Sequence, residues 1–337
     1  MVAARHGVAP RARQRRPGLR RHGRRDAARR VPALAVRAAQ VTASRGRSPA
    51  RARPTYDLID QILALDPGRR GIATFFRPGG ALAAAQALRR ARRVLVVTGF
   101  VVKRDTPETD GPPGAAVLGR ALRSLGARVR YVTDHVSAPI VGAALAALGE
   151  PPEILVCPDG EDAARALLAA ESPTHLVAIE RPGRNRAGDY LSMRGESVAA
   201  WNAPLDAMFM EPSRPTTIGI GDGGNEIGMG AARADLRRLG PLATRIASVV
   251  GVDHLVVAGV SNWGGYGVVA ALSRLAERDL LHTPALERHL VEACVAAGAS
   301  DGVTRRREAT VDGLPIEAHA AVVELLRWAA RSGIIPT

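Results

Sequence analysis

Short apolar runs alternate with longer stretches rich in Ala and Leu from about Tyr56 to the end of the chain. The short runs contain many β-branched residues, which favour strands, and the longer stretches show the amphipathic period of helices. A strand that is apolar at every position is buried on both faces, as in a parallel sheet between two helical layers. The pattern therefore predicts an α/β layered fold, with a mostly parallel sheet and helices on both faces. The predicted strands span residues 93–98, 128–133, 153–157, 175–180, 216–220 and 254–259, and the predicted helices span residues 113–125, 138–149, 160–170, 226–238, 265–277, 284–297 and 315–332.

Residues 1–54 break this pattern, because they contain no Phe, Trp or Tyr and show no sustained apolar period. A segment this poor in core-forming residues cannot fold alone. We therefore predict a disordered Arg-rich tail at residues 1–54 and one folded domain at residues 55–337. A transit peptide, an arm that binds phosphate backbones and an extension from an upstream start codon are alternative interpretations of the tail. No apolar segment follows its charges, which argues against a secretory signal.

The net charge of +15 comes entirely from this tail, which has sixteen Arg and a single acid, Asp26. Residues 55–337 contain 31 basic and 31 acidic residues, so the predicted domain is neutral. Nucleic-acid binding is therefore not favoured, and it stays only as an alternative for the tail.

Two cysteines, Cys157 and Cys294, lie in apolar surroundings without the spacing of a zinc module or a disulfide framework. Such cysteine usage suits a reduced compartment and predicts a cytoplasmic protein. No apolar run reaches the roughly 18 residues that a membrane span requires, which excludes a membrane-embedded protein.

Ligands bind beyond the carboxyl ends of strands in such folds, and the loops there are rich in Gly and in acids. The segment GIGDGGNEIGMG at 219–230 fits G-x-G-x-x-G, but Asp222 and Glu226 would repel a pyrophosphate. At positions i and i+4 of a predicted helix, with Asn225 between them, they suit Mg²⁺, Mn²⁺ or a substrate ammonium group. The alternative is a glycine-rich turn whose acids complement the helix N-terminus.

Three further loops carry candidate site residues. Asp110 either caps the helix that begins at Pro112-Pro113 or faces the cleft beside Glu108, where it can hold a metal or an amine. Glu180 ends a strand, and the arginines that follow it can pair with carboxylates. In the segment at 259–267, Asn262 either contacts a ligand or caps a helix, and glycines let backbone amides approach an oxyanion.

Four segments together resemble the C-terminal domain of the D-glutamate cyclase family: ETDGPPGA at 108–115, ERPGRN at 180–185, GIGDGGNEIGMG at 219–230 and AGVSNWGGYG at 258–267. The likeness runs from about residue 57 to about residue 330. It implies a hydro-lyase that converts D-glutamate to 5-oxo-D-proline and water. Eukaryotic cyclases of this type carry an additional N-terminal hydro-lyase-like domain. Leu191-Ser192 follows Tyr190, where the family suggests a more polar Tyr-Asn pair.

Lactam formation needs a neutral α-amine, supplied by a general base, and a γ-carboxylate made electrophilic by a metal or a proton. We expect Asp222 and Glu226 to hold Mg²⁺ or Mn²⁺, with Asp110 as a third ligand or as the base, and Glu180 to transfer protons. The predicted substrate-binding residues are Arg181, Arg184, Asn225, Asn262 and Gly264, with the two arginines on the α-carboxylate.

Two other functions fit the same residues. The chain could be a different metal-dependent enzyme acting on a small acid or a phosphate. In that case EDTA would abolish its activity, and glutamate would yield no lactam. It could also be an amino-acid-binding module that a ligand stabilises without turnover. The sequence leaves a homo-oligomer open.

Overall fold

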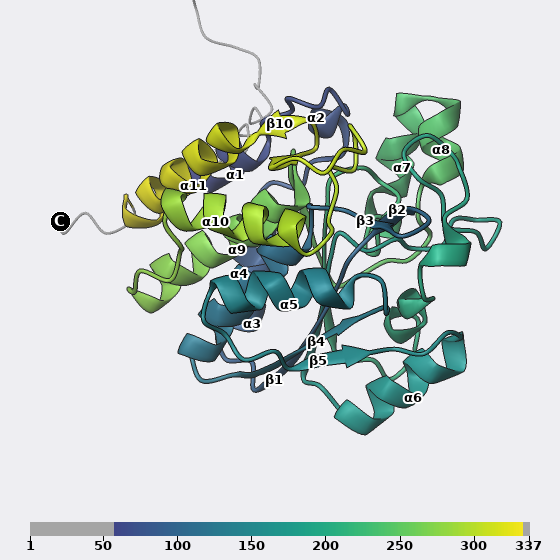
Figure 1. Cartoon of the computed structure of the whole chain (residues 1–337), viewed down its shortest axis with the longest axis horizontal. Coiled ribbons are helices and arrows are strands. Elements are labelled where there is room, and N and C mark those ends of the chain that lie inside the picture. Colours follow the sequence, from purple (N-terminus) through teal and green to yellow (C-terminus); the bar gives the residue numbers. More distant parts are fainter. Residues whose placement is uncertain (1–56, 333–337) are drawn as a thin grey trace, which may run out of the picture. The chain divides into compact units, whose positions relative to one another are not determined.

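A computed structural model describes residues 57–332, and a six-stranded parallel sheet forms the centre of this part of the chain (Figure 1). The strand order across the sheet is β5-β4-β1-β6-β7-β8. The strands are β1 (Arg93–Thr98), β4 (Arg128–Thr133), β5 (Ile154–Val156), β6 (His175–Ile179), β7 (Thr216–Gly221) and β8 (His254–Val257). The predicted α/β fold and its parallel sheet are confirmed.

The chain builds outward from β1 in one direction through β4 and β5, then returns to the other side of β1 with β6, β7 and β8. Val96 in β1 pairs with Tyr131 in β4 and with Val177 in β6. The order of winding therefore reverses between β1 and β6. In open parallel sheets, this switch point leaves a crevice beyond the carboxyl ends of the two strands, where ligands bind.

The two faces of the sheet have separate hydrophobic cores, because successive strand residues point to opposite sides. Val94 and Val96 of β1 pack under a thick helical layer, whereas Leu95 and Val97 pack on the other side. The thick layer contains α1 (Leu58–Leu63), α2 (Ile72–Phe75), α3 (Gly80–Leu88), α4 (Pro112–Ser124), α5 (Ala138–Ala147), α9 (Ser261–Ala276), α10 (Pro284–Ala296) and α11 (Ile316–Arg331). The other core contains α6 (Glu161–Glu171) and the 3-10 helix η2 (Leu205–Phe209) (Figure 1).

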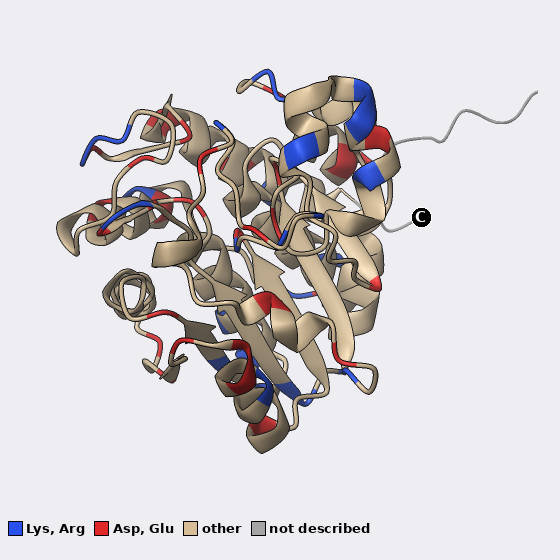
Figure 2. Ribbon diagram, turned by 90° about the vertical axis from the view of Figure 1, so that its right-hand side faces the viewer, with Lys and Arg blue, Asp and Glu red and all other residues tan. Residues whose placement is uncertain are grey.

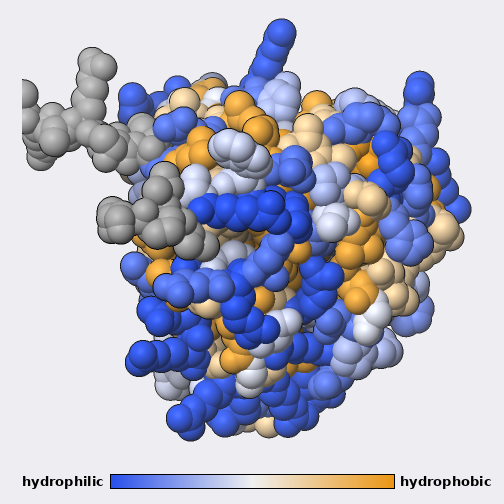
Figure 3. Space-filling view, turned by 90° about the vertical axis from the view of Figure 1, so that its left-hand side faces the viewer, coloured by the Kyte–Doolittle hydropathy of each residue, from blue (hydrophilic) through white to orange (hydrophobic). Residues whose placement is uncertain are grey.

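Charged residues of both signs are interspersed along the ribbon (Figure 2), as expected for a domain with equal numbers of acids and bases. Figure 3 shows that small groups of hydrophobic residues lie among hydrophilic ones on another face. Within residues 57–332, no helix is long and apolar enough to cross a membrane. The predicted tail at residues 1–54 lies outside the described residues.

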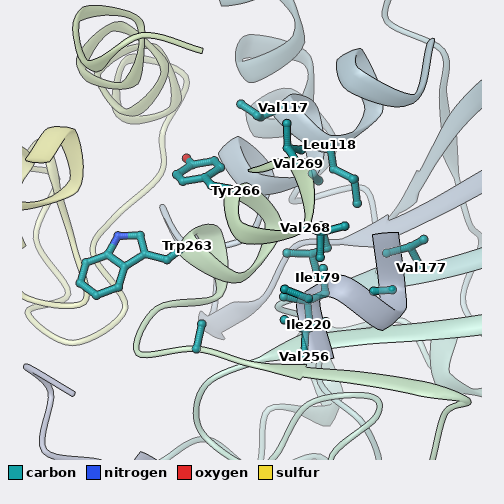
Figure 4. Close-up of a cluster of buried hydrophobic side chains, with 14 of the residues drawn as sticks. Val117, Leu118, Val177, Ile179, Ile220, Val256, Trp263, Tyr266, Val268 and Val269 are labelled. Atoms are coloured by element: carbon teal, nitrogen blue, oxygen red, sulfur yellow. The ribbon is translucent and has the colours of Figure 1, made fainter. Parts of the chain in front are cut away.

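Helix α9 occupies the middle of the thick layer, against α4, α3 and α11. Figure 4 shows Val268 and Val269 of α9 near Val117 and Leu118 of α4. The helix is buried from Ser261 to Ser273, and the small residues among these allow the neighbouring elements to approach it closely. Its largest side chains find polar partners: Tyr266 donates to Glu287 at 2.7 Å, and Trp263 donates to His319 at 2.9 Å. The N-terminus of α9, at Ser261, is thereby fixed beside the carboxyl ends of the strands.

The helix predicted at residues 226–238 forms only in part, because residues 222–229 form a loop and the helical residues begin at Gly230. The side chain of Glu226 turns back and accepts hydrogen bonds from the amides of Asp222, Gly223 and Gly224. Gly224 and Gly228 have φ angles of 99° and 104°, which a helix excludes. Only short helices follow: η3 (Gly230–Ala232), α7 (Arg233–Leu236), η4 (Arg237–Leu239) and α8 (Pro241–Ile246).

Candidate active site

A cavity of about 370 Å³ lies beyond the carboxyl ends of β1, β6 and β7, at the switch point of the sheet. Phe100 follows β1, Glu180 directly follows β6, and Asp222 directly follows β7, and all three line the cavity. Glu108 and Asn225 line it as well. The residues just after the strands therefore converge where parallel α/β folds place their ligands.

The backbone is strained around this cavity. Four of the seven non-glycine residues with positive φ in residues 57–332 line it: Arg69 at 53°, Glu180 at 42°, Arg305 at 59° and Asp312 at 55°. A side chain with a Cβ pays a steric cost in this left-handed region, so the surrounding structure must hold each residue there. Such strain clusters at functional sites, and its concentration here supports a functional role for the cavity.

Carboxylates form the floor of the cavity: Glu108, Glu180, Asp222 and Asp312 line it, whereas Asp110 and Glu226 lie next to these acids without lining it. Asp222 belongs to two groups of acids whose oxygens all lie within 4.8 Å of one another. We name them the Glu226 group, which contains Glu180, Asp222 and Glu226, and the Asp312 group, which contains Asp110, Asp222 and Asp312. The three metal ligands expected from the sequence, Asp110, Asp222 and Glu226, thus lie close together but are divided between two groups.

The loop after β7 presents a free acceptor to the cavity. Glu226 accepts from the amides of Gly223 at 2.6 Å and Gly224 at 2.7 Å, which fixes the loop around it. Asn225, next to it, donates from Nδ2 to the carbonyl of Leu191 at 2.7 Å. Its Oδ1 is buried and has no hydrogen-bond partner within residues 57–332. Asn225, expected to bind the substrate, therefore offers an oxygen at the cavity wall.

Arg70 neutralises part of this acidic floor. Its guanidinium forms ion pairs with Asp222 and, at 2.9 Å, with Asp312, and only 11% of the side chain is exposed. The loop that carries Arg70 is held by Asp66, whose carboxylate accepts from the amides of Arg70 and Gly71 at 2.8 Å each. Arg70 thus links two acids that are 90 positions apart in the sequence.

Burial raises the pKa of four of these carboxyl groups. It raises the pKa of Asp110 to about 7, with the charge of Asp312 as the next cause. Burial, and then the charges of Asp222 and Glu226, hold the pKa of Glu180 well above its usual range. Burial raises the pKa of Glu108 and of Asp222 as well, although Arg70 opposes it at both. The carboxylates therefore repel one another strongly and favour binding of a cation or a proton.

The N-termini of α4 and α9 cap each other across the sheet edge. Asp110 Oδ1 accepts from the amide of Asn262 at 2.8 Å, and its Oδ2 accepts from the amide of Ser261 at 3.0 Å. Asn262 Oδ1 in turn accepts from the amides of Gly111 at 3.0 Å and Gly114 at 2.8 Å. Asp110 therefore caps α9, and on its own side, among the described residues, it accepts only from the amide of the adjacent Gly111, at 3.0 Å. Asn262, expected to orient the substrate, is fully buried and caps α4.

Ser261 joins this N-terminus to the acidic floor. Its hydroxyl donates to Glu180 at 2.5 Å, and its amide is shared between Asp110 and Asp222. The partial positive charge of the sixteen-residue helix α9 thus faces the two aspartates.

The structure corrects the expectation that Arg181 and Arg184 bind a substrate carboxylate. Arg181 is fully buried, and its guanidinium donates to Asp134 at 2.5 Å and to the carbonyls of Gly99 and Ala203. Arg184 forms a two-pronged pair with Asp206, at 2.7 Å and 2.9 Å. Neither side chain lines the cavity, because each meets an internal acid.

Gly264 also lies away from the cavity. Its amide donates to the carbonyl of Val260, the residue before α9, so it is not free to bind an oxyanion. A Cβ at Gly264 would lie 2.5 Å from Cγ2 of Ile220 in β7. The glycine is therefore needed for close packing of the helix on the sheet.

Replacing Gly264 with Ala is expected to destabilise the folded domain by about 1–3 kcal/mol, because the added methyl group overlaps Ile220. Gly142 in α5 is the matched control, since its nearest heavy atom to a new Cβ lies 3.7 Å away. Gly142→Ala is expected to stabilise by about 0.5–1 kcal/mol, from helix propensity. Urea unfolding of both variants measures the difference, and equal effects would contradict this packing role.

Sequence reasoning missed several residues of the cavity. Asp312 lies in the two-residue turn Asp312-Gly313 between β9 (Thr310–Val311) and β10 (Leu314–Pro315), and both turn residues have positive φ. An Asp-Gly pair between apolar residues is a hairpin signal that could have been found, although it gives no hint of the site. Nothing in the local pattern singles out Arg70. Three further arginines that line the cavity were missed as well: Arg69, Arg194 and Arg305. We call these three the rim of the cavity.

Comparisons with known proteins agree with the resemblance noted in the sequence. The family described as "D-glutamate cyclase-like, C-terminal" matches residues 59–327. Human mitochondrial D-glutamate cyclase is 37% identical in an alignment of 233 residues, and the match covers 64% of this chain and 38% of that protein. The chain thus corresponds to well under half the length of this relative.

Two solved structures show weaker likeness. RecJ from Thermus thermophilus, in complex with Mn²⁺, has a TM-score of 0.35 and 14% identity, over 72% of this chain and 26% of its own. An exopolyphosphatase-related protein from Bacteroides fragilis has a TM-score of 0.39 and 9% identity, over 77% of this chain and 61% of its own. At these scores neither structure informs the chemistry of this cavity.

Proposed function

Because the chain belongs to the D-glutamate cyclase-like family, we propose that it is a hydro-lyase that converts D-glutamate to 5-oxo-D-proline and water with the help of a divalent metal. The observation that carries this proposal is the charge layout of the cavity. Buried acids form its floor, and three arginines, Arg69, Arg194 and Arg305, form its rim. An amino dicarboxylate has the complementary arrangement, with an ammonium group between two carboxylates.

The rim supports binding of the substrate α-carboxylate. Arg305 pairs with Glu196 at 2.7 Å, but within residues 57–332 no acid forms an ion pair with Arg69 or Arg194, and the Nη2 of Arg194 donates to the carbonyl of Val303, at 2.9 Å. These guanidinium groups therefore keep the capacity to pair with a carboxylate. They replace Arg181 and Arg184 in the proposal.

The floor supports a metal. Asp222 and Glu226 provide carboxylate oxygens, and Asn225 adds the amide oxygen that lacks a donor. A set made only of oxygens suits Mg²⁺ or Mn²⁺. When bound, such an ion would polarise the γ-carboxyl group of the substrate. Asp110 accepts a hydrogen bond from the same Ser261 amide as Asp222, and so holds the N-terminus of α9 against the proposed metal ligand Asp222.

We assign proton transfer to Glu180. In the overall reaction the C–N bond forms, one C–O bond breaks, and the two protons that the ammonium group loses leave with the departing oxygen as water. Glu180 lines the cavity, and burial with the neighbouring acids raises its pKa well above the usual range, which favours its protonated form. Its hydrogen bond with Ser261 fixes its orientation. Glu180 would thus accept a proton from the amine and deliver one to the leaving oxygen.

Chiral LC–MS of 5-oxoproline tests the proposal. Purified protein is mixed with D- or L-glutamate, with Mg²⁺ or Mn²⁺ and with EDTA. We expect product from D-glutamate, and we expect EDTA to lower the rate at least about 100-fold, because the polarisation of the γ-carboxyl group is lost. Readdition of the metal should restore the rate.

Absence of lactam from both isomers under all conditions would refute this function and favour another small acid or a phosphate as the substrate. Full activity in EDTA would remove the metal from the mechanism. Thermal stabilisation by glutamate without turnover would instead indicate a binding module.

The cytoplasmic location remains a proposal that rests on the cysteines. Cys157 and Cys294 are both free and buried. Burial raises the pKa of the Cys294 thiol to about 12, so it stays protonated and unreactive.

A further inference from the structure

The floor of the cavity contains more ligands than one cation needs. The Glu226 group and the Asp312 group each bring three carboxylate oxygens within 4.8 Å of one another. Metal–oxygen bonds of roughly 2.0–2.6 Å let one hard cation span such a group. Because Asp222 belongs to both groups, its carboxylate lies between two adjacent positions for cations. A carboxylate shared in this way is typical of paired metal ions roughly 3.5–4 Å apart.

Two buried oxygens point independently to ligands beyond the acids themselves. Asn225 is 2% exposed, and its Oδ1 has no hydrogen-bond donor among residues 57–332. Glu108 is 6% exposed, and its Oε1 likewise lacks a donor there. Both side chains line the cavity, Asn225 next to the Glu226 group and Glu108 beside the charges of Asp312 and Asp110. A buried acceptor without a donor is unfavourable, and a metal ion would satisfy it.

The charge of the floor leads to the same conclusion. Within residues 57–332, Glu108 and the five acids of the two groups form ion pairs with one guanidinium, that of Arg70, so with every acid ionised these seven side chains, without the rim arginines, carry a net charge of −5. One divalent cation reduces this to −3, and a second reduces it to −1. The N-terminus of α9 contributes roughly half a positive charge more. Two divalent cations therefore bring the floor close to neutrality.

We propose that the Asp312 group is a second site for a hard divalent cation, bridged by Asp222 to the first, and that Arg70 occupies it when that cation is absent. Arg70 pairs with two of its three acids, Asp222 and Asp312. Its long side chain can swing away while the backbone stays anchored by Asp66. The second cation therefore competes with Arg70 and binds more weakly than the first. This inference rests on the metal-assisted function proposed above.

Titration of the purified full-length chain with Mn²⁺ tests the inference, by calorimetry for stoichiometry and by EPR for the distance between ions. We expect two ions per chain, the second weaker, and an EPR spectrum broadened by coupling between them at saturation. Asp312→Asn should reduce the stoichiometry to one and remove the coupling. Arg70→Met should tighten the second site at least about tenfold, because the competing guanidinium is gone.

Asp105→Asn is the matched control and should leave both sites unchanged. Asp105 has a φ of 50°, close to the 55° of Asp312, but it is exposed and does not line the cavity. One ion per chain in the wild type, two in Asp312→Asn, or an unchanged second affinity in Arg70→Met would each overturn the inference. If a variant fails to fold, the wild-type EPR spectrum still tests the inference, because coupling between two Mn²⁺ ions requires both sites. Since none of these measurements uses glutamate, an absence of lactam refutes the proposed reaction without altering their outcome.

Discussion

Asp222→Asn is expected to lower kcat for 5-oxoproline formation at least about 10³-fold while the domain stays folded. Asp222 is the only acid common to both carboxylate groups and pairs with Arg70, so its loss weakens every cation in the cavity. Loss of metal polarisation corresponds to several kcal/mol of barrier, and each 1.36 kcal/mol is about tenfold in rate. Asn keeps the size of the side chain and an oxygen that can accept from the amide of Ser261.

The measurement is the initial rate of lactam formation by LC–MS, at saturating D-glutamate and metal. A thermal melt checks that the variant is folded, and Asp105→Asn, away from the cavity, serves as the control with an unchanged rate. Wild-type turnover in folded Asp222→Asn would exclude the carboxylate floor from the chemistry, and the site would have to be sought elsewhere.

Arg181→Met is expected to destabilise the domain by about 3–5 kcal/mol, which is the usual result of leaving one partner of a buried ion pair alone. Arg181 is fully buried, and its loss would leave Asp134, itself 6% exposed, without its countercharge. The carbonyls of Gly99 and Ala203 would also lose their donors. Because Arg181 does not line the cavity, KM for D-glutamate should change little in the molecules that remain folded.

Urea unfolding and steady-state kinetics separate this structural role from the substrate-binding role expected from the sequence. Arg186→Met, an exposed arginine of the same loop, is the control and should change the free energy of unfolding by less than about 0.5 kcal/mol. Unchanged stability together with a large rise in KM would restore Arg181 to the substrate.

Much of the fold could be read from the sequence, because strand burial leaves a local signal. The six predicted strands all form, with ends within two residues of the prediction, since runs such as RVLVVT at 93–98 fit only a strand covered on both faces. The first helices were missed, among them α3 (Gly80–Leu88), whose run of alanines carries little amphipathic contrast. The helix expected at 226–238 loses its first turn because residues 222–229 form a loop, in which Gly228 has a φ of 104°, and only short helices follow from Gly230.

The candidate site was only partly predictable. Glu180, Asp222 and Asn225 follow strands directly, and the rule for carboxyl ends of strands placed them at one edge. Asp110 and Asn262 were found as well, but as a cap Asp110 was expected to serve its own helix and instead caps α9, while Asn262 caps α4. They cap each other's helices across 152 positions of the sequence, and no local pattern shows such an exchange.

The sequence by itself determined the parallel sheet, the edge at which its acids gather and the family to which the chain belongs. Each of these follows from local periodicity or from contiguous motifs. Only the tertiary structure decided which charges meet: Arg181 turned inward to Asp134, and Arg70 reached Asp222 and Asp312. The reason is that the energy of a charge depends on its burial and on its distance to other charges, and long side chains allow many partners. Spacing along the chain fixes neither quantity.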